Sequence, residues 1–283
     1  CTPPHTLHPA IQKRIEHACR QMALALDVRG LMNAQMAVRH GEVYVLEVNP
    51  RASRTVPYVS KATGVALAKV AARIFVGQRL KDIGLPRHGE PLKWFAVKEA
   101  VLPFGRFWGT DPILGPEMKS TGEVMGIGMT FEEAYWKSQL AAGQRLPERG
   151  LVFLSVADSD KNWVAEVGWE LADLGFELVA TPGTAEVLRQ AGLEKVHVVS
   201  KISDARGPTV LDLMAKGEVG LLINTPSSIR SRPDEVRIRS EAILRNIPMI
   251  TTGAGAKATV RALRYMREHD WNVCALQDYY AIS

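Results

Sequence analysis

The sequence predicts an α/β protein in two parts. After residue 147, five short apolar segments alternate with five segments of helical periodicity, which is typical of a parallel sheet flanked by helices. Before residue 147, the pattern predicts an amphipathic helix, a hairpin and further helices. The 283 residues, 46% hydrophobic and 23% charged, are typical of a soluble globular protein and sufficient for two domains. We therefore predict a boundary near residues 146–150, with domains at 1–146 and 147–283.

The first part is predicted to begin with a helix and a hairpin. Pro9–Leu26 carries apolar residues at helical spacing, and the strand-like segments Gly30–Val38 and Val43–Val48 flank a glycine-containing turn at Arg39–Glu42. Ser60–Val76, rich in alanine and valine, predicts one buried helix. Two further elements are expected, a strand and a helix opened by a capping box: Phe95–Val101 and Thr130–Gln144.

The second part is predicted to alternate strictly between strand and helix. The strands are expected at Leu151–Val156, Phe176–Ala180, Lys195–Val199, Val219–Ile223 and Pro248–Thr251. The helices are expected at Asp160–Leu174, after Thr181, and at Pro208–Lys216, Pro233–Arg245 and Ala254–His269.

Composition excludes several classes of function. The net charge of +5 is modest and no Lys/Arg block occurs, so we expect no nucleic-acid partner. No apolar run approaches the ~18 residues of a membrane span, and no signal peptide is visible, so we expect a cytoplasmic protein without a membrane partner. The three scattered cysteines indicate neither disulfides nor zinc. Because the chain starts at Cys1 in CTPPHTLHPA, we expect it to begin inside a domain of a longer polypeptide.

Polar residues gather at the end of the second hairpin strand. Glu47 and Asn49 are two residues apart and share a face, and their oxygens suit a hard cation such as Mg²⁺. A three-residue turn would place Gln35 opposite Glu47, whereas a two-residue turn would pair Gln35 with Leu46 and direct it to the other face. Both forms of the turn remain open at this point.

Two arginines follow on the adjoining loop. Pro50 ends the strand, and the guanidinium groups of Arg51 and Arg54 suit phosphate and carboxylate oxygens. They form a clamp for a transferring phosphoryl group if they lie beside a metal cluster. The alternative is an ordinary salt bridge from Glu47 to one of the arginines, with Asn49 capping the turn.

A second candidate site follows the strands of the second part. In open parallel sheets, ligands bind at the carboxyl ends of strands. Two lysines, several hydroxyl residues, an amide and a helix N-terminus fall at such ends and favour a phosphate pocket. These residues are Ser155, Lys161, Thr181, Thr184, Lys201, Asn224 and Ser227. The alternative is that each is a helix cap or a solvated lysine.

Three segments resemble one enzyme family. NAQMAV (Asn33–Val38), VYVLEVNPRASRTVPYVSKATGVALAKVAARI (Val43–Ile74) and LGPEMKSTGEVMGIG (Leu114–Gly128) are similar to the large subunit of carbamoyl phosphate synthetase. The resemblance covers essentially the whole chain. It implies the C-terminal part of the second ATP-grasp domain with its connecting region, followed by a Rossmann-like, methylglyoxal-synthase-like allosteric domain.

The resemblance implies an ATP-dependent ligase that phosphorylates carbamate for arginine and pyrimidine biosynthesis. Gln35 and Glu47 would contact ATP and a Mg²⁺ or Mn²⁺ ion, Asn49 would ligate the metal, and Arg54, with Arg51, would face the transferring group. Partners would be the small glutaminase subunit and the rest of the large subunit. The adenine loop and further phosphate ligands of the family precede Cys1, so we expect the chain alone to be inactive.

For the second part, the resemblance implies a nucleotide effector such as UMP or IMP in the predicted phosphate pocket. Pro226 stands where some members have a phosphate-binding threonine, which puts the effector's identity in doubt. Glu99 matches a position that reaches toward the activator ornithine in some members, the alternative being an exposed carboxylate beside Lys98. Thr251, after the fifth strand, matches the side that faces the ATP-grasp domain, where activator contacts lie in some members. Two rivals remain: a stand-alone nucleotide-binding module, and a methylglyoxal synthase. The latter needs a carboxylate in a GGDQQ-type run, which Lys201–Met214 lacks, since Asp204 and Asp212 do not match it.

Overall fold

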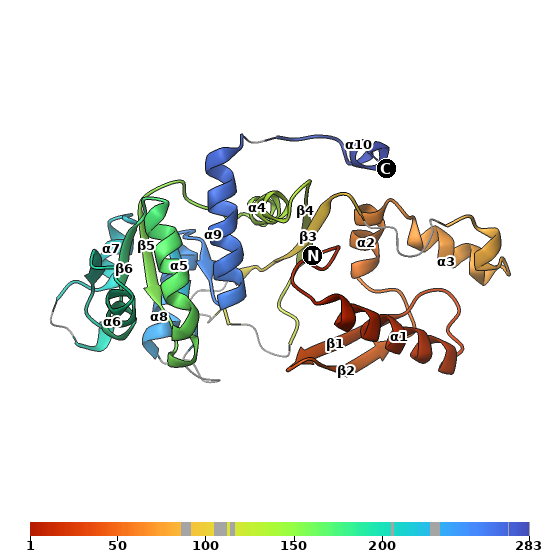
Figure 1. Cartoon of the computed structure of the whole chain (residues 1–283), viewed down its shortest axis with the longest axis horizontal. Helices are drawn as coiled ribbons and strands as arrows, with labels where there is room; N and C mark the ends of the chain where they lie inside the picture. The colour runs from red at the N-terminus through yellow and green to blue at the C-terminus, as the bar shows by residue number, and fades with distance from the viewer. Residues whose placement is uncertain are drawn as a thin grey trace. The chain divides into compact units, whose positions relative to one another are not determined.

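The structure is a computed structural model that describes residues 1–85, 92–104, 112–113, 117–204, 207–226, 233–270 and 272–282. The chain forms two compact units, Cys1–Val97 with Val273–Ser283, and Lys98–Asn272. Figure 1 labels their elements. None of the helices in the described ranges is long and apolar enough to cross a bilayer.

The first unit contains the predicted helix and hairpin, but its third helical segment is divided. Its elements are α1 (Pro9–Ala25), β1 (Asn33–Arg39), β2 (Glu42–Asn49), α2 (Thr55–Thr63), α3 (Leu67–Phe75), η1 (Leu80–Asp82) and α10 (Leu276–Ala281). The single buried helix predicted over Ser60–Val76 is wrong. Gly64 adopts a left-handed φ of 73° and ends α2. Only Ala62 in α2 and Ala71 in α3 are buried.

The hairpin combines a two-residue turn with a bulge. Arg39 pairs with Glu42, and the turn residues His40 and Gly41 have φ of 51° and 80°, the positive values that a type I′ turn requires. The register then shifts between Gln35 and Met36, so that Gln35 pairs with Glu47 and Leu46 is the extra residue. The turn thus has the two-residue form, and the bulge restores the pairing that we expected only from the three-residue form.

A second two-stranded sheet and a helix come next along the chain. The sheet pairs β3 (Phe95–Val101) with β4 (Gly122–Gly128), and α4 (Phe131–Ala141) packs on β4. Sequence reasoning missed β4, which contains three glycines. At Gly126 the approach is so close that a Cβ would lie 2.0 Å from the Ala134 carbonyl oxygen. Thr130 caps α4 as expected, accepting from the Glu133 amide.

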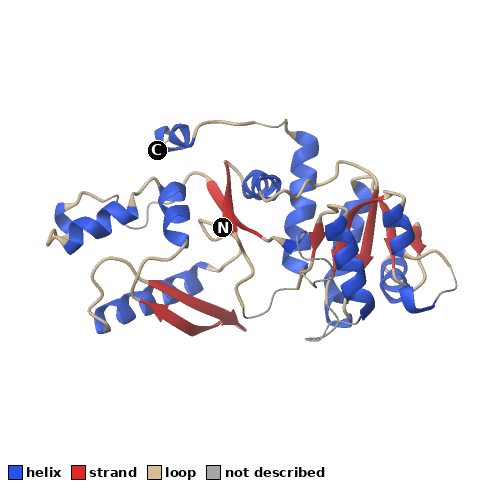
Figure 2. Cartoon of the chain, turned by 180° about the vertical axis from the view of Figure 1, so that it is seen from behind, coloured by secondary structure: helices blue, strands red, loops and turns tan. Residues whose placement is uncertain are grey.

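The second unit is built on the predicted parallel sheet, and Figure 2 shows its strands with helices around them. The strands are β5 (Leu151–Ser155), β6 (Glu177–Ala180), β7 (Val196–Val198), β8 (Val219–Asn224) and β9 (Met249–Ile250), in the order β7-β6-β5-β8-β9. All neighbouring pairs are parallel. The strand order reverses between β5 and β8, the position where such sheets form a crevice at their carboxyl ends.

The helices of the second unit cover both faces of the sheet. They are α5 (Lys161–Asp173), α6 (Pro182–Gln190), α7 (Val210–Ala215), α8 (Pro233–Leu244) and α9 (Gly253–Glu268), with short 3₁₀ turns at Asp158–Asp160 and Ile202–Asp204. Right-handed crossovers put α5 and α6 on one face and α7 and α8 on the other. Contacts place α9 beside α5 and pair α7 with α8. The core lies between these layers, with Phe153, Met214 and Leu222 fully buried.

The compact units divide the chain at residues 97 and 98. Helix α4 packs against α9, where the Tyr135 hydroxyl lies 3.0 Å from the Thr259 hydroxyl and Arg261 pairs with Glu132. Helix α4 therefore belongs to the same compact unit as the parallel sheet. The boundary near 146–150 stays a prediction about the extent of the family domains.

Candidate functional site

The hairpin brings the three predicted metal and ATP ligands together on one carboxylate. Gln35 Nε2 donates to Glu47 Oε1 at 2.8 Å, and Asn49 Nδ2 donates to the same oxygen at 3.0 Å. Glu47 and Asn49 share a face of β2, and the bulge at Leu46 directs Gln35 to that face.

The arginines lie on the loop beyond this cluster. Arg51 donates to the Ala52 carbonyl at 3.0 Å, and Arg54 occupies the N-cap position of α2. Within the described ranges, no ion pair joins Glu47 to Arg51 or Arg54, and the Asn49 side chain donates to Glu47 rather than capping the turn. The salt bridge from Glu47 to Arg51 or Arg54, which was the alternative interpretation of the sequence, is therefore not among the described contacts.

The chemistry of the hairpin cluster fits a nucleotide-bound cation better than a protein-only metal site. A carboxylate and two amides supply oxygen ligands, which hard cations prefer. No group of three or more His, Cys, Asp or Glu side chains placed to hold a metal occurs in the part of the chain that the structure describes. Mg²⁺ commonly binds through one or two carboxylates and completes its shell with phosphates and water. A cation here would require the two amides to turn their oxygens, in place of their N–H groups, toward it.

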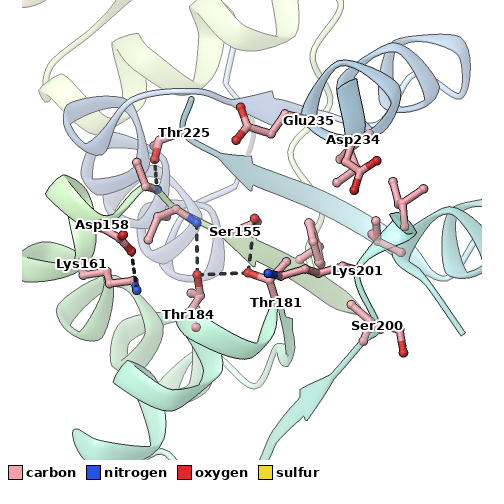
Figure 3. A pocket seen from close by; sticks show the side chains of 18 of the residues that line it. Ser155, Asp158, Lys161, Thr181, Thr184, Ser200, Lys201, Thr225, Asp234 and Glu235 are labelled. Atoms are coloured by element: carbon pink, nitrogen blue, oxygen red, sulfur yellow. Dashed lines mark hydrogen bonds and ion pairs between the residues drawn. The ribbon is translucent and has the colours of Figure 1, made fainter. Parts of the chain in front are cut away.

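The predicted phosphate pocket is a cavity of about 450 Å³ at the carboxyl ends of the parallel strands (Figure 3). Five of the predicted residues line it: Ser155, Lys161, Thr181, Thr184 and Lys201. Ser155 ends β5, and the others come from the segments that follow β5, β6 and β7. The topology thus brings together residues that lie up to 46 positions apart, from 155 to 201, as expected for a crevice at the carboxyl ends of parallel strands.

Hydroxyl contacts fix one wall of this cavity. The Thr181 hydroxyl lies 3.4 Å from the Ser155 hydroxyl and 3.3 Å from that of Thr184. Thr184 Oγ1 also accepts from the Val156 amide at 3.2 Å. Thr181 is the N-cap residue of α6, yet its side chain makes no capping bond. The described contacts therefore do not support the simple cap alternative for this residue.

The lysines contribute positive charge at two sides of the cavity. Lys161 pairs with Asp158 at 2.6 Å and lies against the first turn of α6, where a Cβ on Gly183 would be 3.4 Å from Lys161 Nζ. Lys201 follows β7 and also lines the cavity. An anion placed here would meet lysine charge together with the positive end of a helix.

Asn224 supports the cavity wall instead of lining the cavity. It is almost fully buried, donates to the Ser155 carbonyl at 3.1 Å and accepts from Arg239 at 2.8 Å. Sequence reasoning missed Arg239, which is fully buried on α8 and lies 3.6 Å from Glu235. Ser227 lies outside the described residues.

The cavity also has acidic residues in its wall that were not predicted from the sequence. Asp234 and Glu235 line it, on the side away from Lys161 in Figure 3. Asp234 accepts from the Ser203 amide at 3.2 Å. Thr225, in the run that follows β8, also lines the cavity, and its hydroxyl accepts from the Ala157 amide at 2.9 Å. The signal that could have found the acids is their place in the first turn of the helix after β8.

The two residues predicted for activator contacts line a second cavity, of about 490 Å³. Glu99 comes from β3 and Thr251 follows β9, so the fold of the second unit brings together positions 152 residues apart (251 against 99). Glu99 accepts from Gln139 Nε2 at 2.9 Å. Burial raises the pKa of the Glu99 carboxyl, and the bond from Gln139 opposes part of that shift.

Known proteins are similar to this chain over almost its whole length. A family described as "Carbamoyl-phosphate synthase L chain, ATP binding domain" matches residues 1–83, and one described as "MGS-like domain" matches residues 164–251. Carbamoyl phosphate synthase large chains from Synechocystis sp., Rubrobacter xylanophilus and Archaeoglobus fulgidus are 50%, 50% and 48% identical over 99% of this chain. The chain is homologous to the C-terminal portion of the carbamoyl phosphate synthase large chain.

The chain spans 26% of the length of those carbamoyl phosphate synthase large chains. The predicted fold class is confirmed: part of an ATP-grasp, ATP-binding domain precedes a five-stranded parallel sheet of MGS-like type. A solved methylglyoxal synthase from Elizabethkingia anophelis is 21% identical, with a TM-score of 0.33 over 41% of this chain and 79% of that one. That likeness is too weak to support an argument.

Proposed function

We propose that the first unit contributes one wall of the site where a carbamoyl phosphate synthase phosphorylates carbamate with ATP. The observation that carries the proposal is the convergence of Gln35 and Asn49 on the Glu47 carboxylate. These three side chains would hold Mg²⁺ or Mn²⁺ with ATP, and the cation, when bound, neutralises phosphate charge. Arg54, with Arg51, would stabilise charge on the transferring phosphoryl group.

The large and small subunits of the enzyme would supply the rest of this site and its ammonia. The chain corresponds to about a quarter of its relatives, so the remainder of the large chain and a glutaminase subunit are the proposed partners. We place the protein in the cytoplasm, in arginine and pyrimidine biosynthesis, and expect the isolated chain to make no carbamoyl phosphate.

Substitution of Glu47 in the full-length large chain tests the metal and ATP assignment. Glu47→Gln keeps the shape of the side chain but removes its charge, so we expect carbamoyl phosphate formation to be abolished while the subunits still assemble. Glu42→Gln is the matched control, because Glu42 lies on the same strand and pairs with Arg14 at 2.7 Å. Near-normal synthesis by Glu47→Gln would overturn the assignment.

For the second unit, we propose that the cavity at the strand ends binds a nucleotide effector such as UMP or IMP. The lysines and the carboxylates that line this cavity support a ligand with an anionic end and a hydroxyl-bearing end. The cavity around Glu99 is proposed to take a cationic activator such as ornithine, since a carboxylate favours an ammonium group. The second unit by itself would then be the stand-alone nucleotide-binding module.

Calorimetry on this chain tests the effector cavity. We expect Lys201→Ala to weaken UMP or IMP binding about tenfold or more, because a charge-assisted hydrogen bond is lost. Lys195→Ala is the matched control, since Lys195 is exposed and precedes β7 at the opposite end of the strand. No binding heat from wild-type chain with either nucleotide would count against the cavity as the effector site.

The methylglyoxal synthase alternative gains no support from Asp212. Its carboxylate accepts from the Thr209 amide at 2.7 Å and from the Thr209 hydroxyl at 2.8 Å, and these bonds lower the pKa of Asp212. A carboxylate committed to capping α7 is poorly suited to act as a base. We expect no methylglyoxal from dihydroxyacetone phosphate in a direct assay.

A further inference from the structure

A segment from late in the sequence packs into the first unit. Residues 273–282 belong to that unit, although the chain reaches them from Asn272 of the second. Tyr279 is 4% exposed, and Lys93 Nζ donates to the Ile282 carbonyl at 2.7 Å. The segment is therefore docked on the first unit through both a buried ring and a polar contact.

This segment caps the C-terminal end of α2. The last four carbonyls of a helix have no partner within the helix. The Tyr280 hydroxyl donates to the Lys61 carbonyl at 2.6 Å, and Trp94 Nε1 donates to the Ala62 carbonyl at 2.8 Å. The Tyr280 ring also lies over Gly64, where an added Cβ would be 3.2 Å from the ring.

The three aromatic rings form one group at this helix end. The Trp94 centroid lies 6.1 Å from that of Tyr279 and 6.2 Å from that of Tyr280, within the range of favourable aromatic pairs. Trp94 is 4% exposed, so its position is fixed by packing. The group therefore holds the end of α2 by packing as well as by hydrogen bonds.

The opposite end of α2 carries Arg54. The helix has nine residues and spans about 13 Å at 1.5 Å per residue. Arg54 at the N-cap has φ of −60° and ψ of −21°, so the helical backbone continues through it. A shift or tilt of the helix at Lys61 is therefore carried to the Arg54 backbone.

We propose that Tyr280 is a positioning residue that sets the placement of Arg54 by capping the far end of α2. The proposal rests on the role in phosphoryl transfer proposed above for Arg54. Catalysis of that transfer depends mainly on placement of charge, and a misplacement of about 1 Å can cost about 100-fold in rate. Tyr58 also anchors α2, through a hydroxyl 2.7 Å from the Ala96 carbonyl, so removing Tyr280 should displace the helix rather than release it.

The test uses the full-length large chain assembled with its small subunit. ATP formation from ADP and carbamoyl phosphate measures the reverse of the proposed step, and bicarbonate-dependent ATP hydrolysis serves as the readout of the first ATP-grasp domain of the large chain. For Tyr280→Ala we expect kcat of ATP formation to fall about tenfold or more, with KM for ADP within about twofold and bicarbonate-dependent hydrolysis unchanged. Tyr280→Phe keeps the ring but loses the hydroxyl that caps Lys61, so its kcat should fall between those of wild type and Tyr280→Ala. Gln277→Ala, an exposed change on the same short helix, should match wild type.

Two outcomes would overturn the inference. Equal loss of both partial reactions in Tyr280→Ala would indicate general destabilisation, and unchanged kcat of ATP formation would show that the cap does not place Arg54. Arg54→Ala in the same assay separates this failure from that of the proposed function. If Arg54→Ala is inactive while Tyr280→Ala is normal, only the positioning role fails. If Arg54→Ala is fully active, the proposed role of Arg54 is wrong, and the positioning role of Tyr280 that rests on it is wrong as well.

Discussion

The hairpin of the first unit and the parallel sheet of the second hold their polar side chains by different means. No residue of α1, β1 or β2 is buried in this chain, and Leu46 on β2 is 66% exposed. In the second unit, by contrast, β5 and β8 are largely buried, and the cavity at their ends rests on a packed core. Local pairing thus suffices to assemble the hairpin cluster, whereas the cavity depends on the tertiary structure of the whole second unit.

The largest expected effect contrasts one apolar residue from each region. Phe153 is fully buried, so Phe153→Ala should lower the free energy of unfolding by about 3–5 kcal/mol. Leu46→Ala should change it by less than about 0.5 kcal/mol, because the side chain is exposed in this chain. Urea denaturation of both variants measures the difference. Similar losses for the two would remove the contrast between the regions.

The next effect concerns polar support. Arg239→Ala removes the fully buried guanidinium that donates to Asn224 and lies 3.6 Å from Glu235, and we expect the free energy of unfolding to fall by about 3 kcal/mol. Arg245→Ala is the charge-matched control just after the same helix, and it should cost less than about 1 kcal/mol because its pair with Glu241 is partly exposed. Gln35→Ala in the exposed hairpin cluster should be close to neutral. The same urea titrations test all three, and a small loss for Arg239→Ala would contradict the supporting role of the buried network.

A third comparison asks whether α4 is held as closely as the structure indicates. Gly126→Ala should destabilise the chain by about 1–3 kcal/mol, because its Cβ would meet backbone atoms of α4. Gly122→Ala, on the same strand, meets nothing within 4 Å and should be tolerated. Thermal unfolding followed by circular dichroism distinguishes the two. Equal midpoints would mean that α4 can move away from β4 at little cost.

The smallest expected effect concerns two carboxyl groups, Glu99 and Glu42, whose pKa values shift in opposite directions. Burial raises the pKa of Glu99, so its contribution to stability is full below the unfolded pKa of about 4.3 and is lost as pH rises through the folded pKa. The hydrogen bond from Arg14 lowers the pKa of Glu42, so its contribution is present above about 4.3 and is lost as pH falls through the lowered pKa.

Urea midpoints measured across pH test this pair of signs. Relative to wild type, Glu99→Gln should become more stable as pH rises from about 4 toward neutrality. Glu42→Gln should be slightly less stable than wild type at neutral pH, and this difference should disappear as pH falls below about 4. If both substitutions changed stability in the same direction as pH rises, the partial burial of Glu99 would not control its pKa.

Periodicity and strand-end topology predicted much of this molecule. The alternation after residue 147 predicted all five parallel strands. The expectation that ligands bind at the carboxyl ends of such strands predicted that Lys161, Thr181 and Lys201 line one cavity. The strand β4 was missed because its glycines carry no strand signal. The prediction of a single helix over Ser60–Val76 was wrong because it followed the alanine-rich pattern and ignored Gly64, which ends α2.

The sequence by itself determined which residues share the hairpin and which follow the parallel strands, because strand alternation and turn chemistry act over short distances. Only the tertiary structure decided that a bulge at Leu46 turns Gln35 toward Glu47, since a one-residue shift in register is not visible in the hydrophobic pattern. It also decided that Arg239 is buried beneath the cavity and that Tyr280 caps a helix 219 positions earlier. Such contacts depend on which distant surfaces pack together, and no local preference encodes them.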